Sequence, residues 1–436
     1  MQSDESKSLQ KICHEIIPGG CHTYAKGDDQ FPENSPAFLK RGSGSHVWDF
    51  DDNEYIEYGM GCRAVTLGHA YPPVVEAAQN EMLNGANFCR PAPIETYCAQ
   101  SLLEMVPAAE MVKFVKDGSS ATTAAVKLAR AVTGRDKVAF CIDHPFFATN
   151  DWFIGKTAMD AGIPEQTKSL SLTFSFNDIN GLEALFNANP NEIACVILEP
   201  TKYEPPKDNF LHRVKDLCHR NGALFVLDEM ITGFRWHNGG CQSLYDIEPD
   251  LSTFGKALGN GFAVSALLGK SQYMERGGLY HNHPRVFLLS TTHGAETHAL
   301  AAAIATMDTY KNEPVIETLS NQGMRLKSGL DEVIANHDLQ DYVQIVGEPQ
   351  CLVYVTKDQD KKSSQYYRAL FMQEIIKRGI IGPSFIISYS HSNDDVDKTI
   401  EAVDGALAVY SRAISDGVDR YLSGGPTQVV YRTYNQ

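Results

Sequence analysis

Short apolar runs alternate with helical periods through the middle of the chain, and this alternation constrains the fold more than any other feature. The runs are VKFV at 112–115, VAFCI at 138–142, ACVIL at 194–198, ALFVL at 223–227, VSALL at 264–268 and VFLL at 286–289. Continuous apolar runs of this length are typical of strands buried on both faces, and helices between them favour parallel pairing. The pattern predicts an α/β domain with a mostly parallel sheet.

The two ends of the chain follow a different pattern. Residues 36–60 hold two strand-like runs joined by the turn-forming sequence DFDDN, which is typical of a hairpin. After Ala299 the pattern becomes helical, with further helices expected near 364–378 and 395–413. We therefore expect a smaller α+β domain built from both termini. Its parts are residues 1–65 and 311–436, and the large domain spans residues 66–310.

Charge and hydropathy exclude several classes of partner. The chain has 38 Lys and Arg against 54 Asp and Glu, a net charge of −16 that opposes binding to nucleic acid and to anionic membranes. No stretch has the ~18 consecutive apolar residues that a membrane-spanning helix needs, and the N-terminus lacks the apolar core of a signal peptide. We expect a cytoplasmic protein with no membrane or nucleic-acid partner.

The cysteines and histidines lack the spacing of metal sites. The 10 cysteines include no CxxC pair, so we expect reduced thiols, and the 14 histidines form no HExxH motif. The closest cluster, His281 and His283 in a polar loop, is typical of plain surface. We predict no metal.

Polar residues at the strand ends deserve inspection because ligands bind beyond the carboxyl ends of strands in doubly wound sheets. Gly118 and Ser119 follow the first run and open a helix expected over 120–132. Backbone N–H groups, hydroxyls and the helix dipole at such a turn suit a phosphate. A helix cap without any ligand remains the alternative.

Two further strand ends carry an acid and a base. Asp228 follows ALFVL, and an aspartate there must meet a cation or strong donors, or else serve as a structural carboxylate paired with Arg235. Lys256 lies among glycines after residues 249–254; a buried lysine loses its charge readily and forms Schiff bases with aldehydes, although a lone lysine is usually solvated. Thr291 and Thr292 follow the last run, where they can donate to a phosphate or cap a helix.

Together these groups match the needs of pyridoxal 5′-phosphate (PLP). The cofactor needs a lysine for its aldehyde, a carboxylate for its pyridine nitrogen, a phosphate cup and a flat apolar cover. Phe146 and Phe147, beyond the VAFCI run, are candidates for that cover.

The chain resembles the class III (fold type I) PLP-dependent aminotransferases, in the branch that includes glutamate-1-semialdehyde 2,1-aminomutase. Ordered motifs over nearly the whole chain carry the resemblance: Ile17-Pro18-Gly19-Gly20, Gly68-His69-Ala70, Lys127-Leu128-Ala129-Arg130, Leu198-Glu199-Pro200, Leu227-Asp228-Glu229 and Gly255-Lys256. The resemblance implies a large domain with a mostly parallel seven-stranded sheet flanked by helices, and a homodimer with shared active sites.

The resemblance also implies roles for single residues. Lys256 is implied to bind the cofactor aldehyde and carry protons, with Asp228 as partner of the pyridinium. Further implied cofactor contacts are Gly118 and Ser119 on the phosphate, Phe146 stacked on the ring, Glu204 near the ring hydroxyl, and Thr291 and Thr292 reaching the phosphate in the other subunit.

On the substrate side the sequence departs from the aminomutase pattern. Lys26 stands where the mutase has an arginine, Cys62 aligns with its active-site tryptophan, and residues 383–387 differ from its Pro-Ser-Gln-Phe-Glu segment. A mutase must retain its diamino intermediate, so these losses favour a two-substrate transaminase. Lys26, Arg63 and Arg235 are candidate partners for substrate carboxylates, and each could instead be a structural ion-pair residue.

The segments HTYAKGDDQFPE and FGKALGNGFAVSALLGK are similar to those of aminotransferases in bacterial surface-sugar pathways, nearest to those that make the 8-amino form of the lipopolysaccharide sugar Kdo. This resemblance implies transfer of the amino group of L-glutamate to the C8 aldehyde of 8-dehydro-Kdo. Three alternatives stay open: the aminomutase, a transaminase for another keto or aldehyde acceptor, and a non-catalytic PLP-binding protein.

Overall fold

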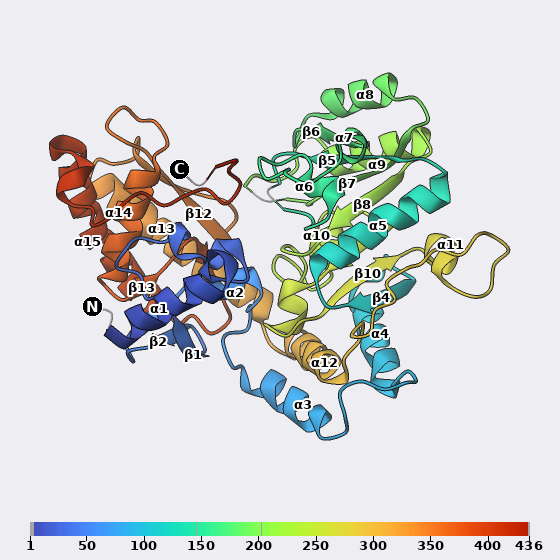
Figure 1. Cartoon of the computed structure of the whole chain (residues 1–436), viewed down its shortest axis with the longest axis horizontal. Helices are drawn as coiled ribbons and strands as arrows, with labels where there is room; N and C mark the ends of the chain where they lie inside the picture. Colours follow the sequence, from blue (N-terminus) through green and yellow to red (C-terminus); the bar gives the residue numbers. More distant parts are fainter. Residues whose placement is uncertain (1–3, 145, 202, 435–436) are drawn as a thin grey trace. The chain divides into compact units, whose positions relative to one another are not determined.

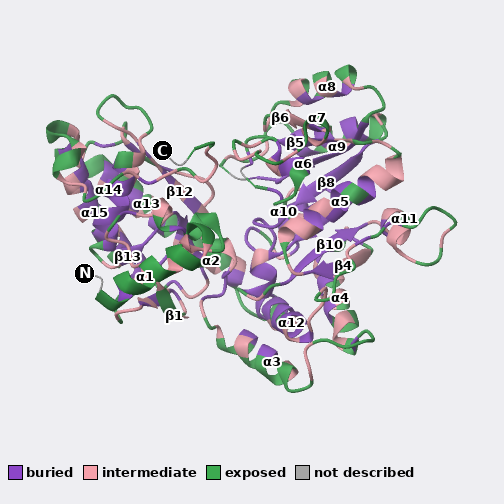
Figure 2. Ribbon diagram, in the orientation of Figure 1, coloured by how far each residue is buried: buried purple, intermediate pink, exposed green. Residues whose placement is uncertain are grey.

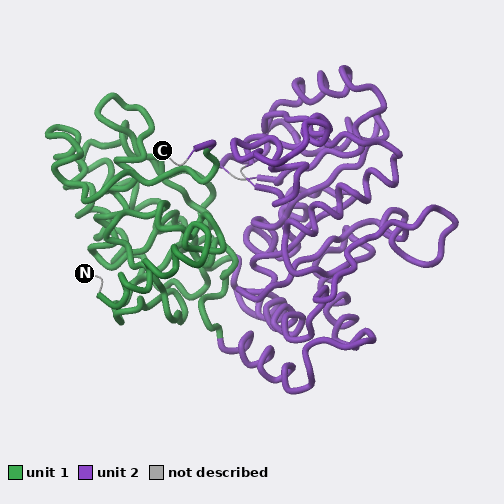
Figure 3. Tube along the Cα trace, viewed as in Figure 1, with its two compact units in different colours: residues 1–71, 317–432 green, residues 72–316, 433–436 purple. Residues whose placement is uncertain are grey.

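The computed structural model describes residues 4–144, 146–201 and 203–434, which form two compact units (Figure 3). The small unit contains Met1–Tyr71 and Glu317–Arg432, and the large unit contains Pro72–Ile316 together with the residues from Thr433 onward. The units therefore divide at 71/72 and 316/317, whereas the sequence prediction placed its domain boundaries at 65/66 and 310/311. Each unit is described by itself.

The large unit is built on a seven-stranded sheet with the order β4-β10-β9-β8-β7-β5-β6. Its strands are β4 (Met111–Val115), β5 (Lys137–Cys141), β6 (Ser171–Phe174), β7 (Ile193–Leu198), β8 (Leu224–Asp228), β9 (Leu251–Phe254) and β10 (Ser265–Gly269). Only β10 runs antiparallel to its two neighbours, and the other pairs are parallel. The expected α/β fold with a mostly parallel sheet is confirmed.

One predicted strand is wrong. Residues 286–289 are not a strand; they lie in an irregular segment before α12, although Val286 donates its N–H to the carbonyl of Arg276 at 2.8 Å. Val286 and Leu288 are buried, whereas Phe287 is 69% exposed. The apolar run thus has alternate residues facing inward, and no strand among the described residues pairs with it.

Helices cover the sheet of the large unit (Figure 1). They are α3 (Pro72–Met82), α4 (Pro93–Met105), α5 (Gly118–Thr133), α6 (Asp151–Ile154), α7 (Glu165–Ser169), α8 (Ile179–Ala188), α9 (Phe210–Arg220), α10 (Gly240–Leu244), α11 (Ser271–Met274) and α12 (Thr297–Asn312), with 3-10 turns η4 (Lys256–Gly259) and η5 (Glu275–Gly277). Helix α5 packs on β7, β9 and β10, α9 on β8, and α8 on β6. None of the helices in the described part of the chain is long and apolar enough to cross a membrane.

The strands of the sheet are almost wholly buried (Figure 2). Side chains of β7 and β8, among them Val196 and Phe225, pack with Phe186 of α8 and Val214 of α9 in one apolar core. Full burial explains why these strands have continuous apolar sequences rather than alternating ones.

The small unit contains two further sheets. Its strands are β1 (Leu39–Ser43), β2 (His46–Asp49), β3 (Glu54–Glu57), β11 (Val343–Val346), β12 (Cys351–Thr356), β13 (Ile380–Ile381) and β14 (Phe385–Ile386), in the orders β1-β2-β3-β13 and β11-β12-β14. The hairpin expected within residues 36–60 is β2 and β3. Its turn is closed by the Asp49 carboxylate, which accepts the N–H groups of Asp51 at 2.9 Å and Asn53 at 2.8 Å.

Helices from both ends of the chain complete the small unit. They are α1 (Asp4–Ile16), α2 (Met60–Arg63), α13 (Val315–Asn336), which begins at the boundary, α14 (Gln365–Ile376) and α15 (Asn393–Asp416), with 3-10 turns η1 (Pro18–Gly20), η2 (Tyr24–Lys26), η3 (Asp28–Gln30) and η6 (Val418–Arg420). Helices α14 and α15 pack against each other. The N-terminal strands and C-terminal helices thus share one unit.

Candidate active site

Asp228 is a buried carboxylate at the carboxyl end of β8, with 2% of its surface exposed. The Thr253 hydroxyl donates to its Oδ1 at 2.9 Å, and the Met230 N–H donates to the same oxygen at 3.0 Å. Burial, and after it the charge of Glu199, raise the pKa of Asp228 to about 7, although the charge of Lys256 acts in the opposite direction. This carboxyl is therefore held in place and is poised to exchange a proton near neutral pH.

Lys256 begins η4, directly beyond the end of β9, and has a positive φ of 42°. Its influence on the pKa of Asp228 means that its ammonium and the carboxylate interact electrostatically. Gly255, before it, is tightly packed, because a Cβ there would lie 2.5 Å from Oγ of Ser265 and 2.6 Å from Sδ of Met230. The lysine thus lies at the carboxyl-end edge of the sheet, where Asp228 also lies.

The turn predicted to hold a phosphate begins α5 beyond β4. Helix α5 starts at Gly118, and its N-cap is Asp117, whose carboxylate accepts the Ser120 N–H at 2.8 Å. The capping residue is therefore Asp117, and the helix begins two residues before the range 120–132 that the sequence predicted. The Ser119 hydroxyl oxygen accepts the N–H of Thr149 at 3.1 Å. Two hydroxyls and the helix N-terminus still meet at this turn.

Met230 connects these three strand ends, a contact that the sequence did not reveal. A Cβ added at Gly118 would lie 2.8 Å from Met230 Sδ, and Gly255 approaches the same sulfur. The Met230 N–H also donates to Asp228. The turn at Gly118, the carboxylate of Asp228 and the segment before Lys256 therefore all contact Met230.

Glu229 is a second buried carboxylate that sequence reasoning missed. It accepts the Thr232 hydroxyl, the Cys241 N–H at 2.9 Å and the Gln242 N–H at 2.7 Å. Burial raises the pKa of Glu229 to about 7. Its own N–H donates to the carbonyl of Thr253 at 2.9 Å, so its backbone is bonded to β9 while its side chain holds the loop that follows Asp228. The acidic pair directly after a buried strand was the available signal.

Phe146 is the exposed member of the aromatic pair expected to cover the cofactor. It is 43% exposed and meets the ring of Phe153 edge-on, with the centroids 5.8 Å apart. Phe147 is 2% exposed and belongs to the core. Nearby, Nδ1 of His144 accepts the N–H of Glu199 at 3.0 Å. Of the two phenylalanines, Phe146 has the surface available for a ligand.

Three other predicted cofactor residues lie on the surface of the large unit. Thr291 and Thr292 are exposed in the loop before α12, and Asn87 donates its Nδ2–H to the carbonyl of Thr292 at 2.9 Å. Glu204 is hydrogen-bonded to Lys207, which lowers the pKa of Glu204. Their cofactor roles stay predictions.

The three candidate substrate cations differ in setting. Arg235 is fully buried in the large unit and donates from Nε to the carbonyl of Ile231 at 3.0 Å, which favours its structural alternative. Lys26, exposed at the end of η2, and Arg63, at the end of α2, belong to the small unit.

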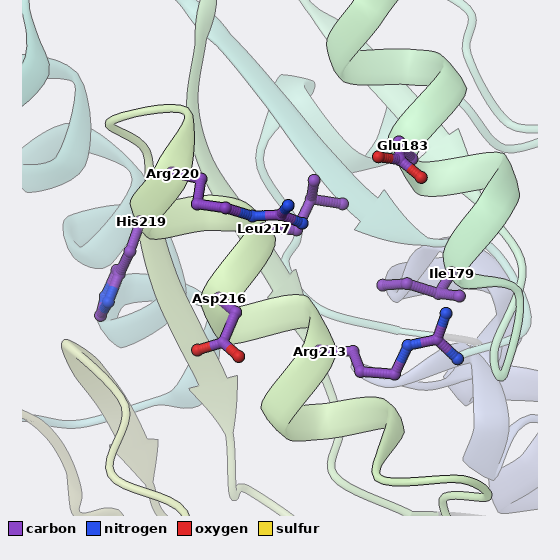
Figure 4. A pocket seen from close by; sticks show the side chains of 7 residues that line it. All are labelled: Ile179, Glu183, Arg213, Asp216, Leu217, His219 and Arg220. Atoms are coloured by element: carbon purple, nitrogen blue, oxygen red, sulfur yellow. The ribbon is translucent and has the colours of Figure 1, made fainter.

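A surface pocket of about 490 Å³ between α8 and α9 is separate from these residues (Figure 4). It is lined by Ile179, Glu183, Arg213, Asp216, Leu217, His219 and Arg220. Helix α9 leads into β8 at Leu224, the end of that strand opposite Asp228. None of the predicted site residues lines this pocket.

The chemical groups at the strand ends are those that PLP requires. A buried carboxylate, a lysine coupled to it electrostatically and a helix N-terminus packed without space for side chains provide partners for a pyridine nitrogen, an aldehyde and a phosphate. On a mostly parallel seven-stranded sheet, this set defines a PLP-dependent transferase of fold type I.

Comparison with known proteins gives the family. The model of the aminotransferase class-III family matches residues 29–406, and the chain belongs to this family of PLP-dependent aminotransferases. Glutamate-1-semialdehyde 2,1-aminomutase of Methanosphaera stadtmanae is 31% identical over 433 residues, covering 93% of this chain and 99% of the relative. The aminomutase of Acetivibrio thermocellus is 32% identical and covers 92% and 97% of the two chains.

Solved structures agree with this family. The FumI protein of a Sphingopyxis species, solved with PLP, superposes with a TM-score of 0.86 at 28% identity, over 95% of this chain and 98% of that chain. An omega-transaminase from Sphaerobacter thermophilus gives 0.82 at 25% identity, over 93% and 98%. The predictions of fold, PLP as cofactor and aminotransferase activity are confirmed.

Proposed function

We propose that this aminotransferase moves the amino group of L-glutamate onto the aldehyde of a sugar acid. The acceptor we favour is 8-dehydro-Kdo, which gives 8-amino-3,8-dideoxy-manno-octulosonate for lipopolysaccharide. One contrast carries the proposal: the groups suited to the cofactor are present and built into the sheet, whereas the mutase's arginine and tryptophan are replaced by Lys26 and Cys62, both exposed.

Bound PLP supplies an electron sink for the pair of electrons released at the amino-bearing carbon. Lys256 is the residue we assign to bind the cofactor and to move the proton at that carbon. Asp228, with Oδ1 held by Thr253 and Met230, presents its charge to the pyridine nitrogen. Because a fixed carboxylate need not reorganise during the reaction, it stabilises developing charge efficiently.

The remaining residues bind and shield. Gly118 and Ser119 would hold the phosphate with backbone N–H groups and a hydroxyl at the start of α5. We assign Phe146 to cover the ring and Glu204 to its hydroxyl. Substrate carboxylates need cations; Lys26 and Arg63 are our candidates, whereas burial of Arg235 gives it lower priority.

The proposal includes a homodimer and a cytoplasmic location. In the dimer, Thr291 and Thr292 would reach the phosphate of the partner subunit's cofactor; both lie exposed in their loop. A reducing compartment agrees with the 10 cysteines, all of which are free thiols.

A second candidate function is glutamate-1-semialdehyde 2,1-aminomutase activity. Curated relatives that carry this name are 30–32% identical and extend over 91–93% of the chain, which supports it. A mutase exchanges the amino group within one molecule and needs no separate donor. Conversion of the semialdehyde without an added donor would therefore identify it.

The deciding experiment is the visible spectrum of purified holoenzyme before and after addition of L-glutamate. We expect the visible cofactor band to fall while 2-oxoglutarate is released, and to return on addition of 8-dehydro-Kdo. A band that is indifferent to glutamate contradicts the donor. A band that falls with glutamate but returns only with another aldehyde contradicts the acceptor.

A further inference from the structure

The C-terminal tail of the small unit, residues 421–432, is anchored by buried polar side chains. Gln373 of α14, fully buried, donates its Nε2–H to the carbonyl of Tyr421 and accepts the N–H of Ser423, both at 2.8 Å. Thr427, 2% exposed, donates its hydroxyl to Oε1 of Gln365 at 2.8 Å. The match to the family model ends at residue 406, so this tail lies beyond it.

The tail also binds the N-terminal segment that carries Lys26. Gln428 donates its N–H to the carbonyl of Asp29 in η3 at 2.8 Å. Nη2 of Arg432 lies 2.6 Å from Oδ2 of Asp29, and the two side chains are 23% and 35% exposed. Arg432 is itself fixed, because its Nη1 donates to the carbonyl of Val429 at 2.8 Å.

The neighbouring carboxylate, that of Asp28, is bound by side chains of helix α1. Asp28 lies 2.7 Å from Nε2 of His14 and accepts Nε2–H of Gln10 at 3.0 Å, both from α1. Lys26, unlike the two aspartates, has no side-chain partner for its ammonium among the described residues. It is also exposed. Two aspartates close to a lysine in sequence are thus each held by a different residue.

We propose that Arg432 is a positioning residue that keeps Lys26 available for a substrate carboxylate. While Arg432 holds Asp29, that carboxylate is turned toward the tail. Without Arg432, Asp29 would be an unengaged anion three residues from Lys26, and opposite charges at that spacing attract each other. The lysine would then be neutralised by its own chain. This inference rests on the proposed role of Lys26 in substrate binding.

The test uses Arg432→Gln in the full-length holoenzyme. The measured quantity is the substrate concentration that gives half the maximal rate of band loss, with L-glutamate and with 8-amino-Kdo as alternative amino donors. For the donor that Lys26 binds, we expect about a two- to fivefold rise, since the competing Lys26–Asp29 contact would be an exposed ion pair and such pairs are weak. The cofactor band and the maximal rate should stay unchanged.

Two companion variants separate positioning from general damage. Lys26→Ala should give a similar rise, and the double variant with Arg432→Gln should be no worse than Lys26→Ala alone. Adding Asp29→Asn to Arg432→Gln should restore the wild-type value, because a neutral side chain does not compete for the lysine. Arg325→Gln is the control for loss of an arginine–aspartate pair: Arg325 makes such a pair, more exposed than that of Arg432, with Asp397 in the small unit.

Each of these measurements either supports or overturns the proposed role of Arg432. A wild-type half-saturation value in Arg432→Gln, or a defect that Asp29→Asn does not rescue, overturns the inference. If Lys26→Ala binds both donors normally, the inference falls with the role of Lys26. The proposed amino transfer is judged separately, by whether the wild-type band responds to glutamate at all.

Discussion

The hydroxyl of Thr253 offers the sharpest test of how this fold sets the charge of Asp228. Thr253 is fully buried on β9 and donates to Oδ1 of the carboxylate at 2.9 Å. Thr253→Val keeps the shape of the side chain and removes the donor. Since the donor favours the ionised form, its loss should raise the pKa of Asp228 above its wild-type value of about 7.

The size of the shift follows from the strength of the contact. A hydrogen bond to a charged group is worth about 1.5–3 kcal/mol, and one pKa unit corresponds to about 1.4 kcal/mol. The variant should therefore have a pKa near about 8–9. At pH 8 the wild-type carboxyl is about 90% ionised, and that of the variant only about 10–50%.

The assay is the affinity of the apoenzyme for PLP, measured by protein fluorescence between pH 5.5 and 9. Binding should weaken below the pKa of Asp228, because only the ionised carboxylate attracts the protonated pyridine nitrogen. The break in the profile should move upward by about 1–2 pH units in Thr253→Val. Ionisations of PLP itself are common to both profiles and cancel in the comparison.

Thr306→Val is the matched control. Thr306 is also fully buried in the large unit, but its hydroxyl donates to the carbonyl of Ala302 at 2.8 Å. The Thr306→Val variant should leave the pH of the break in the PLP-affinity profile unchanged. A folded Thr253→Val protein with an unshifted break would refute the reasoning that this contact controls Asp228.

Three further predictions concern other parts of the chain. Lys256→Ala should abolish turnover, checked by 2-oxoglutarate release, and a normal rate would remove the lysine from the mechanism. Gly118→Ala should weaken PLP binding in fluorescence titration, because its Cβ would lie 2.8 Å from Sδ of Met230 and would force that side chain to shift, whereas Gly425→Ala, where a Cβ meets no atom within 4 Å, should leave PLP affinity unchanged. Burial lowers the pKa of His391 to about 4. The folded state therefore binds fewer protons than the unfolded state between pH 6.5 and 4, and the small unit should lose up to about 3 kcal/mol as pH falls through this window. Amide exchange of α15 would measure this loss, and His391→Gln should flatten it.

Most of the central sheet was predictable because its strands are buried on both faces. The runs at β5, β7, β8 and β10 are continuously apolar, and the run at β4 is interrupted only by Lys113. Strands β6 and β9 are mixed, since Ser171, Thr173, Ser252 and Thr253 interrupt their apolar residues. The segment at 286–289 has the composition of a strand but does not pair with another strand among the described residues. Composition alone cannot show whether a pairing partner is present.

The strand-end position of Asp228 and Lys256 was readable, since parallel strands bring their carboxyl ends to one edge. The contacts that fix them were not. Glu229 is engaged by N–H groups 12 and 13 residues later in the chain, and Met230 touches glycines from two other strand ends. The sequence left open whether Arg235 binds a substrate carboxylate or is a structural residue, and the fold buries it completely. Such pairings depend on the path of loops, which no local pattern encodes.

The shared contact at Met230 links the evolutionary histories of three separate motifs. A larger residue at position 118 or 255 would displace the sulfur of Met230, and at position 255 also the hydroxyl of Ser265, because these atoms occupy the space that the added Cβ would enter. A shortened residue at 230 would in turn leave a void beneath both glycines and favour their enlargement. Accessible mutational paths through this region therefore depend on order, and homologues should change these positions together rather than singly.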